Sequence, residues 1–468
     1  MSKQHRRFSL VPLTFSSWIK RTGKMTFSPA VPPQAPVPCP AAADRNAWHA
    51  YWQAHGQSWR TEPEIDPKRQ AELDQHRAIV PDTEKGIYPF KGMKLSRPDV
   101  EWLLATHENG RGPVDWSDES QRNRDGLDLR GSDLCHVDLR QLPLARLRCG
   151  FTHDEQRQGT EAQCVMARAH MEDMFLNGAQ LQGVYLHNVL LARSQLVGAQ
   201  LEGADLSSAN LQEANLMRGQ FKQAILRGAR LQEANLYRAQ LEEANLYETK
   251  LSGANLRDVM LSSQKHIGPL LADVQWTEVN LARVNWSQGM ILGDEQRARQ
   301  KKTNGKKKTN EQRLPEYESA VRANRQLAVA LQDQGLNEEA ACFAYQAQKL
   351  QRIVLRRRHR FGQYLFSLFL DLLAGYGYKP WRSFLAYLLV ISGFATAYYF
   401  LGHIVGPTLS PLGAFVFSMT SFHGRGFFPG NNISLDDPLT VLAAFEALVG
   451  LIIEVMFIAT LTQRFFNR

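Results

Sequence analysis

Leucine recurs at every fifth position through the middle of the chain, with phenylalanine in its place once. The eighteen positions are Leu176, Leu181, Leu186, Leu191, Leu196, Leu201, Leu206, Leu211, Leu216, Phe221, Leu226, Leu231, Leu236, Leu241, Leu246, Leu251, Leu256 and Leu261. Two residues before most of them stands a small residue or valine, and most of the remaining positions are polar. A period of five fits neither an α-helix of about 3.6 residues per turn nor a strand with a period of about two, so the chain must coil on itself.

Each group of five residues can form one side of a square coil. Four groups then make one turn, and successive turns stack at the strand spacing of roughly 4.8 Å. The leucine and the small residue two positions earlier point inward, while the other three positions face water. Inward apolar side chains cannot form a catalytic site, so any function of this region must lie on its outer faces.

Units such as GADLS, SANLQ and EANLY resemble the consensus A-(D/N)-L-x-x of the pentapeptide-repeat family. The resemblance covers roughly residues 127–291 and implies a right-handed quadrilateral β-solenoid. Some members of that family resemble duplex DNA in shape and negative charge and so bind type II topoisomerases. Residues 166–291 here carry 12 acidic and 11 basic side chains, and this near balance argues against DNA mimicry.

Two further runs with the same period adjoin the main series. The earlier run, at Leu129, Leu134, Leu139 and Leu144, has a shifted phase, which predicts an insertion near residues 150–165 between two stacks of coils. The later run, at Trp276, Leu281 and Trp286, keeps the main phase. We expect its aromatic residues to cap the final coil.

Residues 315–360 show the pattern of two amphipathic helices joined by a turn at residues 334–337. The apolar positions are Tyr317, Val321, Leu327 and Leu331 before the turn, and Ala340, Phe343, Tyr345, Ala347 and Leu350 after it. This pattern resembles one tetratricopeptide hairpin, which implies an element of packing or assembly. Residues 292–314, rich in lysine and arginine, are predicted to form a basic linker between the solenoid and this hairpin.

Two apolar runs, at residues 384–401 and 439–461, come close to or exceed the length needed to span a membrane. The first run carries no charged residue, and the second carries two glutamates. Basic residues flank both runs and predict that both termini are cytoplasmic. Between the runs, residues 412–421 are too few to cross a bilayer but suit a re-entrant half-helix within a loop at residues 411–430. Residues 361–468 are therefore predicted to be an α-helical two-transmembrane pore-like domain in the inner (plasma) membrane.

This region resembles the two-transmembrane potassium-channel pore family. The segment FSMTS, residues 417–421, stands where that family has the end of its pore helix, and residues 372–382 look like the entry to the first helix in bacterial proteins that fuse pentapeptide repeats to this pore. The resemblance implies a homo-oligomer, a tetramer by analogy, around a central axis.

The filter-like loop of the predicted pore differs from the family pattern T-x-G-Y-G. It comprises Thr420, Ser421, Phe422, His423, Gly424, Arg425 and Gly426. Gly424 and Gly426 are kept, but Arg425 replaces the tyrosine and His423 replaces an apolar residue. Four arginines beside a carbonyl-lined filter would repel potassium unless they were paired or pointed away, so a potassium-selective conductance does not follow from the resemblance.

The second apolar run carries Glu446, Gly450 and Glu454 at every fourth position, which places them on one face of a helix. Intramembrane carboxylates are costly unless they face a partner or water, so both are candidates for a pore face or gate. The alternative for Glu446 is a structural clamp on Arg425 or on the pore-helix backbone. Gly450 is a candidate gating hinge or a site of close helix packing.

Charge and composition limit the classes of partner that the sequence favours. The net charge of +9 is concentrated in residues 297–313 and 352–360, which flank the membrane candidate. We therefore expect anionic membrane lipids as partners rather than nucleic acid, because no groove-reading module accompanies the charge. The five scattered cysteines indicate a reducing compartment and no metal framework.

The amino-terminal part is less informative. Residues 1–43 are basic and proline-rich and are predicted to be a disordered arm without a signal peptide. Residues 44–126 contain Trp48, Trp52, Trp59 and Trp102 and are predicted to form a small, mainly helical segment, packed against the end of the solenoid.

Two functions are compatible with these features. The first is a channel-like oligomeric membrane protein with a cytoplasmic pentapeptide-repeat sensing or docking domain, and with ion conduction through a filter unlike that of potassium channels. The alternative is a non-conducting, membrane-anchored scaffold that recruits an unknown protein partner through the solenoid, and Arg425 favours it. We expect no cofactor, no metal and no enzymatic activity, because no nucleophile–base constellation, phosphate loop or metal-ligand spacing is apparent.

Overall fold

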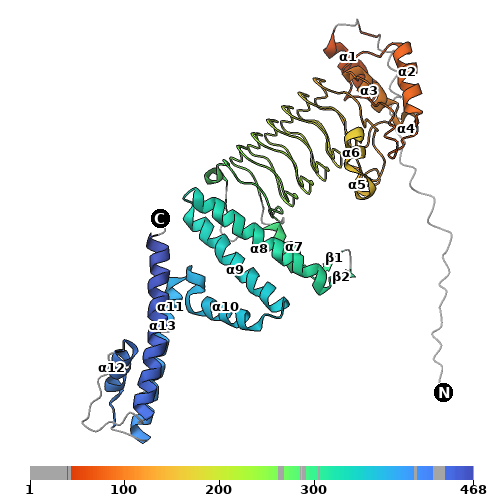
Figure 1. Cartoon of the computed structure of the whole chain (residues 1–468). Helices are drawn as coiled ribbons and strands as arrows, with labels where there is room; N and C mark the ends of the chain where they lie inside the picture. Colours follow the sequence, from red (N-terminus) through yellow and green to blue (C-terminus); the bar gives the residue numbers. More distant parts are fainter. Residues whose placement is uncertain are drawn as a thin grey trace, which may run out of the picture. The chain divides into compact units, whose positions relative to one another are not determined.

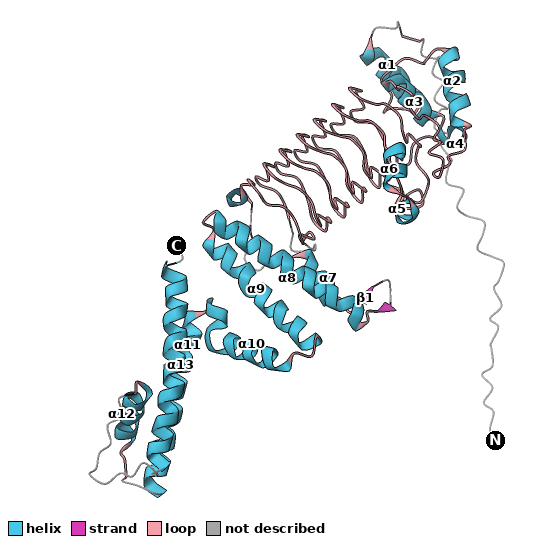
Figure 2. Cartoon of the chain, in the orientation of Figure 1, coloured by secondary structure: helices cyan, strands magenta, loops and turns pink. Residues whose placement is uncertain are grey.

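The computed structural model describes residues 39–40, 44–261, 268–284, 286, 291–303, 306–404, 408–424 and 438–466 (Figures 1 and 2). The predicted disordered arm lies almost wholly outside these residues. The chain divides into two compact units, Met1–Thr61 and Glu62–Arg468, so the predicted segment at residues 44–126 spans a boundary instead of forming one unit. In the first unit, α1 (Arg45–Ala54) buries Trp48 and Trp52, and the Arg60 guanidinium lies 3.6 Å from the centroid of the Trp52 ring.

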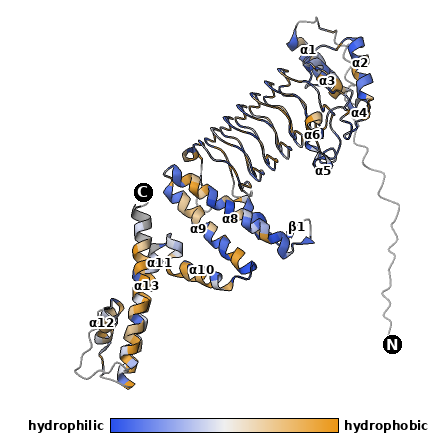
Figure 3. Cartoon of the chain, in the orientation of Figure 1, coloured by the Kyte–Doolittle hydropathy of each residue, from blue (hydrophilic) through white to orange (hydrophobic). Residues whose placement is uncertain are grey.

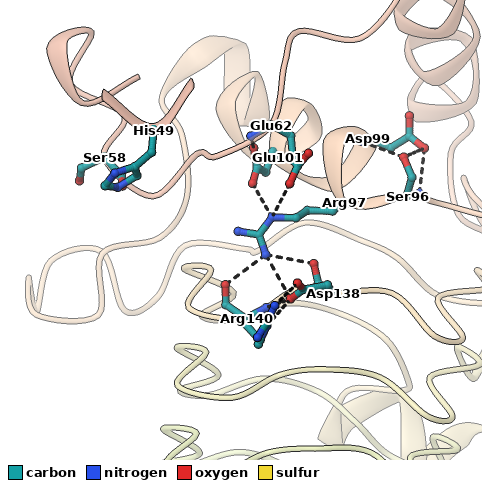
Figure 4. A network of polar contacts seen from close by, with 9 residues as sticks. All are labelled: His49, Ser58, Glu62, Ser96, Arg97, Asp99, Glu101, Asp138 and Arg140. Carbon is teal, nitrogen blue, oxygen red and sulfur yellow. Dashed lines mark hydrogen bonds and ion pairs between the residues drawn. The ribbon is translucent and has the colours of Figure 1, made fainter. Parts of the chain in front are cut away.

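The second unit begins with three helices, α2 (Pro67–Arg77), α3 (Arg97–Ala105) and α4 (His107–Gly110). Helix α3 starts at a capping box in which Ser96 and Asp99 satisfy each other's backbone N–H groups. Its Arg97 joins the helix to the first coil (Figure 4): Nε donates to Glu101 at 2.8 Å, and Nη1 donates to the carbonyl oxygen of Asp138 at 3.0 Å. The buried guanidinium therefore fastens α3 to the solenoid.

Between residues 170 and 260, coils of the solenoid pair through parallel bridges between residues twenty positions apart, such as Phe175 with Gln195, and the two bridges that follow join residues twenty-five positions apart. Twenty residues are four pentapeptides, the number that the sequence predicts for one turn. All eighteen central side chains are at most 4% exposed, as the inward position predicts. Each side contributes single bridging residues, so the right-handed sense and square section stay predictions. Pairing begins at Lys94 with Asp133, earlier than the predicted start at residue 127.

A tight turn closes each side of the coil, and the periodicity did not indicate its conformation. The N–H of Ala204 donates to the carbonyl of Leu201 at 3.1 Å, and Gly203 between them has φ +64°. Through the turns that the structure describes, the same left-handed position, two residues after the central residue, holds glycine in some units and Ser208, Glu213 or Arg218 in others. A turn with positive φ at its third residue favours glycine there.

This geometry predicts a difference between two neighbouring turns. A Cβ added at Gly203 would meet no atom within 4 Å, so Gly203→Ala adds only backbone strain and should lower the unfolding free energy by about 1 kcal/mol. Ser208, at φ +57°, already bears a Cβ, so Ser208→Ala should change it by less than about 0.5 kcal/mol. Urea unfolding of the purified variants measures both changes in unfolding free energy. Equal unfolding midpoints for the two variants would contradict the backbone strain expected at Gly203.

The insertion near residues 150–165 consists of two short helices, α5 (His153–Gln158) and α6 (Glu161–Ala167). Bridges from Asp133 to His170 and from His170 to Leu190 run past it. The coils on the two sides of the insertion therefore form one stack, whereas the shifted phase predicts two.

The basic linker predicted at residues 292–314 is largely folded. It follows the short 3₁₀ helix η1 (Leu281–Arg283) and contains α7 (Gly293–Arg299) and the antiparallel pair β1 (Lys302–Thr303) and β2 (Lys306–Lys307). Asp294 is buried, accepts the Leu271 N–H at 2.6 Å, and has a pKa that burial raises to about 6. The linker prediction was wrong because the few residues that pack against the last coil are scattered among exposed lysines.

The helical hairpin consists of α8 (Asn310–Asp333) and α9 (Asn337–Arg357), with Gly335 in the turn at φ +76°. Helix α8 starts five residues before the predicted position because Thr309 caps it and Pro315 is accommodated in its second turn. The predicted apolar positions are buried except Tyr345, which faces α10 and donates to Asp371 at 3.0 Å.

The hairpin also covers the last coil. The Gln334 side chain accepts the Leu281 N–H at 2.7 Å, Gln326 accepts the Asp273 N–H at 2.8 Å, and the Trp286 ring packs edge-on against Phe343. The sequence assigned the cap to the tryptophans alone. Here a tryptophan and the hairpin form it together.

The remaining helices are α10 (Phe361–Ala374), the 3₁₀ helix η2 (Gly375–Gly377), α11 (Pro380–Ile404), α12 (Pro411–Phe422) and α13 (Pro438–Phe466). Residues Trp381–Ile404 and Pro438–Ala459 form two helices long and apolar enough to cross a membrane. Figure 3 shows hydrophobic residues along α13 and a mixture along α8 and α9. Helix α12 is a shorter apolar helix between them in sequence.

Candidate pore-like site

Helix α12 packs against both α11 and α13. Ser410 caps its amino terminus by accepting the Gly413 N–H at 3.1 Å, and Pro411 occupies its first turn. Two buried clusters hold the three helices together, one of Tyr398, Ala414, Phe417, Leu439 and Ala443 and the other of Ile391, Phe422 and Ile453. The apolar run of ten residues read from the sequence is therefore a helix packed between two longer ones.

Glu446 is fully buried where α13 meets the other two helices. Its Oε2 accepts the Tyr398 hydroxyl from α11 at 2.7 Å, and its Oε1 contacts the Ser418 hydroxyl of α12. Ser418 Oγ also lies 2.9 Å from the carbonyl oxygen of Ile391. The carboxylate therefore links all three helices through side chains, whereas the sequence considered Arg425 or the pore-helix backbone as its partner.

Gly450 lies one turn further along α13, directly against the end of α12. A Cβ at this position would stand 2.1 Å from the carbonyl oxygen of Phe422 and 3.0 Å from its carbonyl carbon. Such a distance is impossible without moving a backbone, so this glycine allows close helix approach. Its role as a gating hinge stays a prediction.

Glu454 lies beside His423, the residue that follows α12. Nδ1 of His423 lies 2.8 Å from the Met419 carbonyl oxygen, which can only accept, so Nδ1 carries a hydrogen. Nε2 lies 3.2 Å from Glu454 Oε1 and 3.3 Å from the Tyr387 hydroxyl of α11. Glu446, Gly450 and Glu454 therefore share the face of α13 that contacts α12 and the residue after it, as their spacing predicts.

The half-helix predicted at residues 412–421 is α12, which runs one residue further than predicted and includes the first three residues of the filter-like loop. Thr420, Ser421 and Phe422 form the last turn of α12, and the Thr420 hydroxyl donates back into its own helix, 2.9 Å from the Phe417 carbonyl oxygen. The helix continues because its apolar side chains, Phe422 above all, stay buried against α11 and α13. Gly424 has φ +68°. Arg425 and Gly426 lie outside the described residues.

Tyr398 and Ser418 belong to this site although the sequence did not single them out. Their signal was weak: one hydroxyl in each of two apolar helices, with nothing to show that both would face Glu446. Among the residues that the structure describes, no group of three or more His, Cys, Asp or Glu side chains could hold a metal ion. The site therefore offers two carboxylates, one imidazole and several hydroxyls, a set suited to proton or cation interactions.

Comparison with known proteins identifies the solenoid. The family model for pentapeptide repeats matches residues 179–223 and 224–262, so the chain contains a pentapeptide-repeat domain. The protein thus combines this domain with a helical region that contains two possible membrane-spanning helices. No curated protein matches the chain.

Among solved structures, a pentapeptide repeat protein (Rfr23) from the cyanobacterium Cyanothece 51142 is 28% identical, with a TM-score of 0.21, over 26% of this chain and 82% of its own. A pentapeptide repeat protein from the Arabidopsis thaliana thylakoid lumen is 22% identical, with a TM-score of 0.20, over 26% and 91%. HetL, a pentapeptide repeat protein involved in heterocyst differentiation regulation in Nostoc sp. strain PCC 7120, is 19% identical, with a TM-score of 0.15, over 43% and 98%.

Proposed function

We propose that this protein is a channel-like, oligomeric membrane protein whose pentapeptide-repeat domain senses a ligand or docks a partner in the cytoplasm. The observation that carries the proposal is the packing of the short apolar helix α12 between α11 and α13 around the buried Glu446. A helix too short to span, followed by a glycine-containing loop and held between two helices of spanning length, is an arrangement typical of pores.

The exposure of α11 and α13 supports their placement in lipid. In the most apolar eighteen-residue stretch of each helix, only 17% of α11 and 22% of α13 is buried, whereas the core helix of a soluble protein would be mostly buried. The outer face of α13 exposes large apolar side chains, namely Val441, Phe445, Leu448, Leu451, Val455 and Ile458. Lipid chains or further copies of the same domain would cover these side chains. In a tetramer, by analogy with potassium channels, lipid would cover some of them and neighbouring copies the others.

A route from the solenoid to α11 supports a sensing role. The hairpin contacts the last coil through Gln326 and Gln334, and its α9 reaches Asp371 of α10 through Tyr345 and Arg352. Asp371 also accepts from Arg382 at the start of α11, at 3.1 Å. Movement at the solenoid would therefore reach the first spanning helix through a continuous chain of packed and hydrogen-bonded elements.

Ion flux into liposomes tests conduction. We expect the wild-type protein to pass cations and Glu454→Gln to reduce the flux at least several-fold, because the variant removes a carboxylate beside the end of α12. Arg425→Tyr should change the selectivity among cations if the loop is a filter. Glu338→Gln, which removes an exposed carboxylate at the start of α9, should leave flux unchanged.

The alternative is a non-conducting scaffold, and Arg425 in the filter-like position favours it. In that case, the wild-type protein and all three variants stay silent across ions, voltages and pH, although they are folded and oligomeric. The spanning helices would then be an anchor, and the outer faces of the solenoid would recruit the partner.

A further inference from the structure

A half-open basic cavity lies at the corner between α9 and α10. Its volume is about 560 Å³, and its lining residues are Asn310, Arg352, Ile353, Arg356, Arg357, His359 and Tyr364. The corner is a Schellman motif: the Arg360 N–H donates to the Leu355 carbonyl at 3.0 Å, and the His359 N–H donates to the Arg356 carbonyl at 3.3 Å. His359 takes the left-handed position, with φ +56°, that glycine usually occupies. This turn brings the end of α9 and the start of α10 around one space.

The lining contains four basic side chains and no acidic one. Burial alone would lower the pKa of Arg352, but hydrogen bonding to Asp371 raises it, so this side chain remains a cation. Arg357 is positioned by Asn310 and lies 5.1 Å from the centroid of the Tyr317 ring. Arg356 is exposed and forms no ion pair within the described part of the chain. The cavity therefore presents cationic donors suited to an anion of phosphate type.

An uncovered apolar face adjoins the cavity. Helix α10 exposes between 42% and 75% of six large apolar side chains, namely Phe361, Leu365, Phe366, Leu368, Phe369 and Leu372. The one acidic residue of α10, Asp371, is ion-paired with Arg352 at 2.6 Å and Arg382 at 3.1 Å. Trp381, at the start of α11, is 62% exposed. An amphipathic helix with this composition beside a spanning helix is suited to the boundary between lipid headgroups and acyl chains.

We propose that this corner binds the phosphate of an anionic phospholipid, with α10 lying on the membrane surface. The basic cavity supplies the headgroup site, and the apolar face of α10 supplies contact with the acyl chains, so the two features together specify a lipid rather than a free anion. The proposal depends on the membrane insertion of α11 and α13 but not on ion conduction. It also assigns a site to part of the basic stretch at residues 352–360.

The test uses the full-length protein in lipid discs of phosphatidylcholine, with or without phosphatidylglycerol. We expect phosphatidylglycerol to raise the melting temperature of the wild type and native mass spectrometry to show retained phosphatidylglycerol. The double variant Arg356→Gln and His359→Gln should bind this lipid at least tenfold more weakly, and Arg356→Lys should keep most of the binding. Arg358→Gln is the matched control, because Arg358 belongs to the same basic run but pairs with Glu318 outside the cavity.

Each outcome decides the proposal. Equal retention of phosphatidylglycerol by the double variant and the wild type overturns the site. An equal melting shift with inorganic phosphate in phosphatidylcholine discs overturns the lipid as the ligand and leaves a free-phosphate site. If the double variant is unstable in phosphatidylcholine alone, loss of binding in Arg356→Ala with an unchanged melting temperature supports the site, and retained binding contradicts it. Liposome flux is measured separately, so a silent pore with bound lipid separates the failure of conduction from the failure of this site.

Discussion

Replacement of Gly450 by alanine should separate the end of α12 from α13. The added Cβ would stand 2.1 Å from the Phe422 carbonyl oxygen. No side-chain rotation can relieve this contact, because the backbone fixes the positions of both atoms. Phe422 cannot retreat easily, because its ring is buried against Ile391 and Ile453. We expect the unfolding free energy to fall by about 3 kcal/mol or more, which is the upper end of what overpacking costs. We also expect weakened oligomers. Thermal unfolding and size analysis in detergent measure both effects.

Gly393 of α11 provides the matched control for this substitution. A Cβ at Gly393 meets no atom within 4 Å, so Gly393→Ala should be neutral or stabilise the helix by up to about 1 kcal/mol. If Gly450→Ala instead folds and assembles like the wild type while altering only the ion flux through the proposed pore, Gly450 is a hinge. The close packing described above would then not be the reason for glycine at this position.

Phe221 and Gly219 should show strong coupling in the solenoid core. Phe221 is the one aromatic central residue of the main series, and a Cβ at Gly219 would stand 2.7 Å from its Cε2 atom. Gly219→Ala should therefore overpack the coil, and Phe221→Leu should leave a cavity, each costing about 1–3 kcal/mol. The double variant recreates the regular Ala-x-Leu unit and should approach wild-type stability.

A double-mutant cycle by urea unfolding measures this coupling, which we expect to be about 2 kcal/mol. Ala229→Gly with Leu231→Phe is the matched reciprocal pair, because it introduces the same combination into a regular unit of the stack. Additive effects in the first cycle would show that the two residues adapt to their surroundings independently, contrary to the structure.

The sequence predicted the elements whose buried positions recur at a regular interval, and it missed those that depend on contacts between distant residues. The central leucines had to lie inside, because no other arrangement repeats every five residues. The left-handed residue of each turn was invisible because polar residues such as Glu213 occupy it more often than glycine does. Tyr345 was assigned to the hairpin core by spacing, but the carboxylate of Asp371, 26 positions later, draws its hydroxyl outward.

The same limit applies to the candidate site. Spacing correctly placed Glu446, Gly450 and Glu454 on one face, because a helix has a fixed geometry. It could not reveal that this face contacts α12, nor that Tyr398 and Ser418 would supply hydrogen bonds to Glu446. The predicted half-helix ended at Ser421, and local apolar packing extends the helix by one residue, through Phe422.

The twenty-residue interval between bridged positions gives the solenoid the properties of a screw thread. Adding or removing a whole turn moves the attached hairpin along the axis by roughly 4.8 Å and leaves its orientation unchanged. In the predicted square coil, adding or removing one pentapeptide also turns the hairpin by about a quarter of a revolution, since four units complete a turn. Repeat number therefore adjusts the distance and the angle between the outer faces of the solenoid and the helices beyond it, while the leucine core repeats from coil to coil.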